Sequence, residues 1–380
     1  MKVSSLRIEI LWRGFRVVAS RVMRLLFLPT LLLFDLGGCA ARIGPRVMAG
    51  DRFDYTEAVS RSWKEQMLLN VVKLRYMDPP MFMDVQQVIQ QYTLEGTGSI
   101  FAPNWPGQAR SVNPSATATG RWAESPTITY VPMSGETFTK SLVQPVTPVD
   151  LFSLIQSGWP IDAVFDVAVR SINGVNAGSR TAMFRRAGDP DFYRAISMMR
   201  ELQDTDSFGI RVDQAKGGTQ DILVFRARQA DEASSATGRK VRELLHLDPD
   251  AQEFRLVSGA VESNNKEIAL LTRSMMEILA EASAGVDVPA SDIGEGRALK
   301  VEKPEGTSDS VPRFAIRVRS SSSKPEATDA FAAVHYRDHW FWVDDRDVPS
   351  KRGLAFLMIL FTLIESGKPA APPALTISKP

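Results

Sequence analysis

The sequence has one cysteine and three histidines, so it offers few groups for the commonest protein chemistries. A single thiol cannot form an intramolecular disulfide, so noncovalent packing must hold the folded chain together. Three histidines leave few ways to assemble a histidine-rich metal site or a catalytic triad. We therefore predict no metal site, no cofactor and no assignable catalytic residue.

Established catalytic motifs are also missing. There is no Walker A loop, no G-x-G-x-x-G, no G-x-S-x-G and no H-E-x-x-H. Ser321 and Lys324 have the Ser-x-x-Lys spacing of penicillin-recognising enzymes, and Thr137 and Lys140 are spaced alike. That motif needs a helix start and two further motifs, and Ser321 lies in a serine run, so we reject it.

A strong excess of charge is absent as well. The net charge is +1, and six basic and two acidic residues precede Cys39, so the remainder of the chain carries about −3. A nucleic-acid-binding domain normally shows a basic excess. The charge therefore predicts no nucleic-acid partner.

No apolar run beyond the N-terminal region is long enough to cross a bilayer. The longest, residues 354–364, has eleven residues and would span only about 17 Å as a helix. A bilayer core is about 30 Å thick. We predict a central core helix, covered on nearly all sides, with the aromatic hairpin that precedes it as part of the cover.

The N-terminus, by contrast, carries a recognisable signal. An apolar run over residues 25–34 is followed by Leu36, Gly37, Gly38 and the sole cysteine, Cys39. These four residues resemble the lipobox of bacterial lipoproteins, in which signal peptidase II cuts just before a lipid-modified cysteine. The resemblance implies that Cys39 becomes the mature N-terminus and carries a diacylglycerol and an amide-linked acyl chain such as palmitate, which together give lasting anchorage.

The same resemblance implies where in the cell the protein is located. Residues 1–38 would be the signal peptide, with Met23 as an alternative start, and residues 39–50 a lipidated tether. An Asp after the cysteine usually retains such proteins in the inner membrane, whereas this chain has Ala40. The implied location is the periplasmic face of the outer membrane, reached through the lipid anchor.

The chain after the tether predicts an α+β fold, because helical and strand patterns alternate without regular β-α repetition. We expect mixed helices and mostly antiparallel strands. The main α+β domain would cover residues 51–285, and residues 286–312 would form a linker or long loop. Residues 313–380 would form a β-hairpin and core helix packed on the main domain.

Periodicity locates the individual elements. The predicted helices are a core helix over 54–77 capped by Asp54, one opening at Thr147, one over 160–172, one opening at Asp189 and one over 268–282. Residues 96–125 are rich in Gly, Ser, Thr and Pro and predict a long loop or weak hairpins. Loops of this length are often contact surfaces, although an exposed spacer is the simpler interpretation.

An aromatic hairpin over residues 332–343 is predicted to turn at Arg337 and Asp338. His335 would then oppose Trp340, and His339 would oppose Tyr336, so the two imidazoles point to opposite faces and are not a metal pair. The following acids, Asp344, Asp345 and Asp347, could bind a cation, but we favour capping of the next helix.

Much of the chain resembles lipoproteins of Gram-negative envelopes whose activity is uncharacterised. The likeness lies in Asp54 and Tyr55 with residues 65–70, in residues 156–160 and in residues 344–352. It implies no activity. Two function classes remain: a non-catalytic binding or structural component with an envelope protein as candidate partner, and a tethered periplasmic hydrolase that uses ordinary carboxylates.

Overall fold

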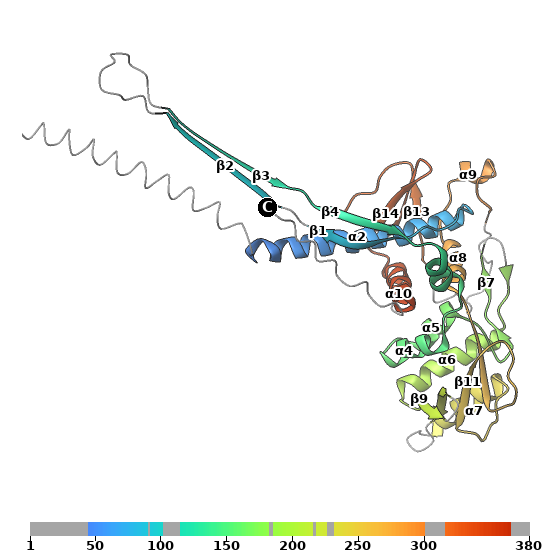
Figure 1. Cartoon of the computed structure of the whole chain (residues 1–380). Helices are drawn as coiled ribbons and strands as arrows, with labels where there is room; N and C mark the ends of the chain where they lie inside the picture. The colour runs from blue at the N-terminus through green and yellow to red at the C-terminus, as the bar shows by residue number, and fades with distance from the viewer. Residues whose placement is uncertain are drawn as a thin grey trace, which may run out of the picture. The chain divides into compact units, whose positions relative to one another are not determined.

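The computed structural model describes residues 45–89, 92–101, 115–181, 185–215, 218–225, 232–300 and 316–365. The chain divides into two compact units, residues 1–63 and 64–380. The described residues of the first unit, 45–63, form the opening turns of helix α2 (Pro45–Arg75). The second unit contains all other described elements (Figure 1).

Helix α2 starts earlier than predicted. Asp54 lies inside it and is not its cap, because proline is tolerated in a first helical turn and no helix breaker other than Gly50 follows Pro45. Arg61 pairs with Glu57 one turn before it, at 2.5 Å. The helix ends before Pro79 and Pro80, as expected.

The second half of α2 confirms the predicted core helix. Leu68 and Val71 have no exposed surface. The Asn70 side chain donates to the Met81 carbonyl at 2.9 Å and accepts from the Met81 N–H at 2.8 Å. Gln66 makes the same two bonds with Met83, at 3.1 and 2.8 Å. These two amides therefore fix the start of strand β1 (Met83–Ile89) on the helix.

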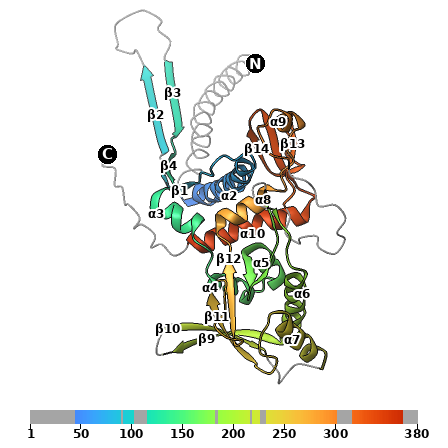
Figure 2. The same ribbon diagram turned by 90° about the vertical axis from the view of Figure 1, so that its right-hand side faces the viewer.

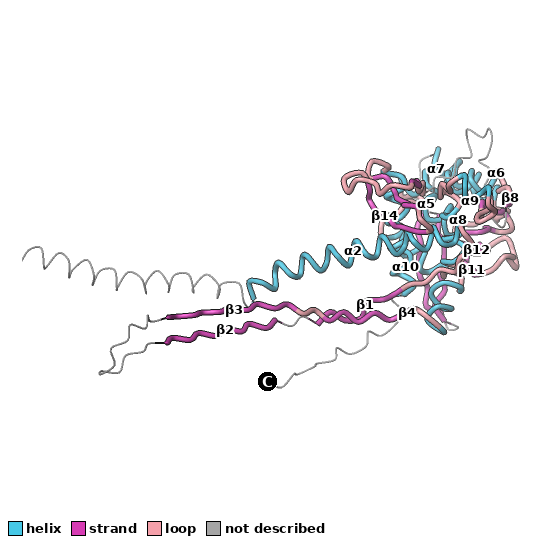
Figure 3. Tube along the Cα trace, turned by 90° about the horizontal axis from the view of Figure 1, so that it is seen from above, coloured by secondary structure: helices cyan, strands magenta, loops and turns pink. Residues whose placement is uncertain are grey.

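Of the two alternatives predicted for residues 96–125, the described residues 96–101 and 115–124 show a hairpin. Strand β2 (Tyr92–Phe101) pairs antiparallel with β3 (Ser115–Glu124) over ten residue pairs, and β1 pairs with β4 (Thr127–Pro132) (Figure 3). Thr97 and Thr119 share a hydroxyl hydrogen bond of 3.2 Å across the ladder. The small polar residues that suggested a loop serve here as exposed strand positions, where threonine is a favoured residue.

A run of short helices follows: α3 (Gly135–Phe138), the π-helix η1 (Thr139–Val143), α4 (Pro148–Gln156) and α5 (Ile161–Ala168). Thr147 caps α4 as predicted, by accepting the Asp150 N–H at 3.2 Å. The predicted helix over 160–172 is wrong in its last turn. The β-branched Val169 and Ile172 are buried in strand β5 (Val169–Ile172), because pairing with a neighbouring strand overrides the helical pattern.

The largest sheet has six strands in the order β6-β5-β12-β11-β10-β9 (Figure 2). Its members are β6 (Val175–Asn176), β5, β12 (Glu267–Thr272), β11 (Glu253–Ser258), β10 (Gly218–Phe225) and β9 (Phe208–Ala215). β11 and β12 run parallel, and the other neighbours run antiparallel. Two short strands, β7 (Ser179–Arg180) and β8 (Arg185–Arg186), pair separately. Together with the helices this sheet confirms the α+β class.

The predicted helix over 268–282 is two elements. Its first half is β12, which is buried on both faces, and its second half is α8 (Met275–Ser283). A strand buried on both faces is apolar throughout and does not show strict alternation, which explains the error. Ser274 separates the elements, because it forms a reciprocal capping box with Glu277.

Two helices cover this region. α6 (Pro190–Asp204), which opens at Asp189 as predicted, contacts α5, α7 (Glu232–Leu244) and strands β6 and β9.

Within the sheet, Glu267 is buried and accepts hydrogen bonds from the Ser263 N–H and from Arg255, and these bonds lower the pKa of its carboxyl.

The predicted linker over 286–312 is partly ordered structure. The short helix α9 (Ala290–Gly294) lies in it, Val286 bridges to Val318, and residues 301–315 lie outside the described residues. Gly285 is needed at this junction, because a Cβ there would lie 2.0 Å from the Ile316 carbonyl oxygen.

The C-terminal segment forms strands β13 (Arg319–Ser321), β14 (Ala330–Tyr336) and β15 (His339–Asp344), in the order β13-β15-β14, and then helix α10 (Val348–Glu365). α10 contacts β15, as the sequence predicts, and also η1. The ring centroids of Phe361 and Phe82 lie 4.7 Å apart, and those of Phe356 and Trp159 lie 5.0 Å apart. The predicted core helix is confirmed for its apolar face, whereas the expected cover on nearly all sides is wrong, because Ile359 is 41% exposed. No helix among the described residues is long and apolar enough to span a membrane.

Candidate binding site

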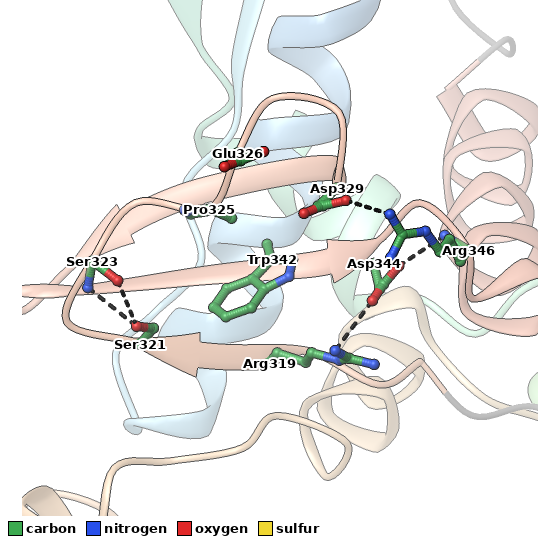
Figure 4. Close-up of a pocket in the computed structure, with 9 residues that line it drawn as sticks. All are labelled: Arg319, Ser321, Ser323, Pro325, Glu326, Asp329, Trp342, Asp344 and Arg346. Carbon is green, nitrogen blue, oxygen red and sulfur yellow. Dashed lines mark hydrogen bonds and ion pairs between the residues drawn. The ribbon is translucent and has the colours of Figure 1, made fainter.

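A hollow of about 270 Å³ opens on the three-stranded sheet (Figure 4). Strands β13 and β15 form its floor, and the chain between β13 and β14 forms its rim. Its volume is just below the roughly 300–1,000 Å³ of common ligand pockets, so it suits one ring-sized or chain-end group. The lining residues are Arg319, Ser321, Ser323, Pro325, Glu326, Asp329, Trp342, Asp344 and Arg346.

The β14–β15 hairpin puts Trp342 on this face. Its turn residues Arg337 and Asp338 have φ of 47° and 63°, which is the conformation that tight two-residue hairpins require. On β15, Phe341 and Val343 have no exposed surface and face the core. Because side chains alternate along a strand, Trp342 lies on the opposite face, where it is half-buried.

Two ion pairs stand at one end of the Trp342 ring (Figure 4). Arg319 lies 3.2 Å from Asp344, and Arg346 lies 2.8 Å from Asp329. Asp344 also accepts the Arg346 backbone N–H at 2.8 Å. Each of these carboxylates is therefore already engaged by a guanidinium, which fixes the frame of the hollow.

The rest of the rim is less constrained. The Ser321 and Ser323 hydroxyls lie 3.1 Å apart, at the end away from the ion pairs (Figure 4). Glu326 is exposed, and its carboxylate contacts no polar group of another described residue within hydrogen-bond or ion-pair distance. The lining holds two guanidinium groups and three carboxylates, which leaves one negative charge in excess.

The predicted site residues fall in two regions. Leu36, Gly37, Gly38 and Cys39 lie outside the described residues. Ser321 lies in a strand, so the Ser-x-x-Lys spacing lacks its helix start, in agreement with our rejection of it.

The histidine geometry follows the predicted register. His335 pairs with Trp340, and Tyr336 pairs with His339, so the two imidazoles belong to opposite faces. Across the described residues, no cluster of three or more His, Cys, Asp or Glu side chains could hold a metal ion.

The three acids at the end of β15 and just after it have separate roles. Asp347 caps α10 by accepting the Ser350 N–H at 3.2 Å and the Ser350 hydroxyl at 2.8 Å. Asp344 pairs with Arg319, and Asp345 pairs with Lys351 at 2.7 Å. The favoured capping interpretation therefore holds for Asp347.

A second polar cluster is buried and serves the fold. The Tyr76 hydroxyl donates to Asp292 at 2.6 Å, and burial together with this bond raises the pKa of Tyr76. Arg75 is 3% exposed and donates to the Leu299 carbonyl at 2.6 Å, while its Nε and Nη1 have no partner among the described residues. Burial lowers the pKa of Arg75. These groups join the end of α2 to the segment that carries α9.

The sequence reasoning missed the Trp342 hollow. The available signal was the alternation of Trp340 and Trp342 with Phe341 and Val343, which marks an aromatic outer face. Comparison of this chain with protein-family models, with curated proteins and with solved structures finds no match.

Proposed function

We propose that this protein is a lipid-anchored envelope lipoprotein that acts as a non-catalytic binding module on the periplasmic face of the outer membrane. The lipobox-like residues and Cys39 support the anchor. The observation that carries the binding role is the half-buried Trp342 at the floor of a hollow framed by two Arg–Asp pairs. Amphipathic aromatic rings at such positions are frequent anchors for ligands and partners.

Replacement of Cys39 by serine should abolish both lipidation and signal cleavage, because the thiol is the acceptor on which both steps depend. Mass spectrometry of the N-terminus of the protein purified from bacterial membranes checks this. The wild-type chain should begin at Cys39 and carry acyl groups. A wild-type chain that is uncut, with an unmodified Cys39, would rule out the anchor.

Site-specific photocrosslinking tests the binding role in the full-length, membrane-attached protein. A photoreactive phenylalanine analogue at the exposed Ser323 should capture a defined envelope component. The same analogue at the exposed Lys240 on α7 is the control and should not. Trp342→Ala should reduce the yield of crosslinked product at Ser323 at least about fivefold, since truncation of an anchor residue typically loses more than 1 kcal/mol of binding free energy. Equal capture from both positions, or capture that ignores Trp342, would contradict the proposal.

The tethered hydrolase remains a second candidate because Glu326, Asp329 and Asp344 line the same hollow. Two of these carboxylates are held in ion pairs, which leaves Glu326 as the carboxylate best placed to act as acid or base. Release of product from purified cell-wall material by the full chain, lost in Glu326→Gln, would replace the binding proposal with this one.

A further inference from the structure

Cations of the chain itself lie over most of the aromatic rings around the three-stranded sheet. Lys324 Nζ lies 5.1 Å from the Trp340 ring centroid. Lys64 and Lys351 lie 4.6 and 5.1 Å from the Phe331 centroid. These distances are within the range of about 6 Å in which a ring quadrupole attracts a cation.

Arg337 extends the pattern to the other side of the hairpin, where its guanidinium carbon lies 5.1 Å from the Tyr76 centroid and 5.6 Å from the Tyr336 centroid. Trp342 differs from these rings. Among the described residues no cation lies over it, and the hollow occupies that place (Figure 4).

The charges around Trp342 favour a cation in the hollow. Arg319 and Arg346 are paired with Asp344 and Asp329, so these four groups nearly cancel. Glu326 supplies the excess negative charge at the rim. A cation above Trp342 would gain both the attraction of the ring face and the field of the Glu326 carboxylate.

We propose that the hollow binds an alkylammonium group, such as the end of a lysine-like side chain, carried by the envelope component that the protein recognises. This proposal rests on the binding role proposed above and names the chemistry of its ligand. The small volume of the hollow fits one chain end, and Trp342 and Glu326 both line it.

The test uses the lipidated protein in detergent, with its tryptophans replaced by 5-fluorotryptophan; six of the seven tryptophans of the sequence follow Cys39. Trp342→Phe identifies the Trp342 resonance in the ¹⁹F NMR spectrum, because one signal disappears while the others stay in place. Nα-acetyl-lysine methylamide is then titrated. Its neutral isostere, Nα-acetyl-norleucine methylamide, and the neutral sugar methyl β-D-glucopyranoside are titrated in parallel.

The lysine probe should shift the Trp342 resonance saturably, with a Kd of roughly 1–10 mM, as expected for an isolated contact of this kind. The norleucine probe should shift it at least fivefold more weakly. Glu326→Gln should weaken binding of the lysine probe about fivefold, and added salt should weaken it further. Glu201→Gln makes the same charge change at an exposed position on α6 and should leave binding unchanged.

The outcomes separate the two proposals. Equal shifts by the lysine and norleucine probes, or a shift by the glucoside alone, would overturn the proposal that the ligand is a cation. If capture at Ser323 still succeeded, the proposed binding role would stand. Binding of the lysine probe that is insensitive to Glu326→Gln would also overturn the cation proposal. Failure of capture at Ser323 together with no shift by any probe would overturn both proposals.

Discussion

Replacing Leu357 by aspartate should unfold the second unit of the protein. Leu357 has no exposed surface and lies on α10 between Leu354 and Leu360, which are equally buried. A carboxylate there would be an unpaired buried charge, whose effective penalty is several kcal/mol. Typical folded domains are stable by only about 5–15 kcal/mol, so this change removes most or all of the margin.

The same helix provides the matched control. Ile359 is 41% exposed, so Ile359→Asp adds the same charge and loses a side chain of the same size, but leaves the carboxylate in water. Thermal unfolding of the full-length chain in detergent, followed by circular dichroism, should show a cooperative transition for Ile359→Asp and none for Leu357→Asp. A Leu357→Asp protein as stable as its parent would mean that α10 is not a core helix.

Replacing Asn173, in the turn between β5 and β6, by alanine should strongly destabilise the six-stranded sheet. It is 4% exposed, and its side-chain amide donates to the Leu245 carbonyl at 2.9 Å and to the Glu267 carbonyl at 3.2 Å. Its side-chain oxygen accepts the Ala269 N–H at 2.7 Å. Asn173→Ala would leave three buried backbone groups without these partners, each at a cost of about 1–3 kcal/mol, so we expect a loss of at least about 3 kcal/mol.

Replacement by glycine separates the contribution of the side-chain hydrogen bonds from that of the left-handed backbone at Asn173. Asn173 has φ of 46°, a left-handed conformation that glycine adopts freely and alanine does not. Asn173→Gly should therefore lose the hydrogen bonds but be about 1 kcal/mol more stable than Asn173→Ala in urea unfolding. The exposed Asn265→Ala should change stability by less than about 0.5 kcal/mol. Asn173 variants that match this control would show that the side chain does not hold β5 to β12.

Several elements were predictable because their determinants are local. The Thr147 cap needs only its own side chain and the next turn of helix, and both are adjacent in sequence. The β14–β15 hairpin is similar, because its two-residue turn fixes the register of every later pair. That register also placed the His335 and His339 imidazoles on opposite faces of the hairpin.

Other elements could not be assigned locally. The sequence of β12 predicts part of a helix, because its apolar residues fit both the helical period and the strand period. Only its position between β5 and β11 makes it a strand. Val169 and Ile172 were assigned to a helix for the same reason. In each case pairing with a segment distant in sequence decided the outcome, and no window of the sequence contains that partner.

The sequence by itself determined the core character of residues 354–364, the α+β class and the expectation of a lipidated Cys39, because apolar periodicity and a terminal signal are properties of contiguous residues. The tertiary structure decided the candidate site. Arg319 comes from β13, Asp329 from the loop before β14, and Trp342 from β15, and antiparallel pairing brings them together. A hollow requires side chains from separate strands to surround a space that none of them fills, and such a space has no trace in the order of residues.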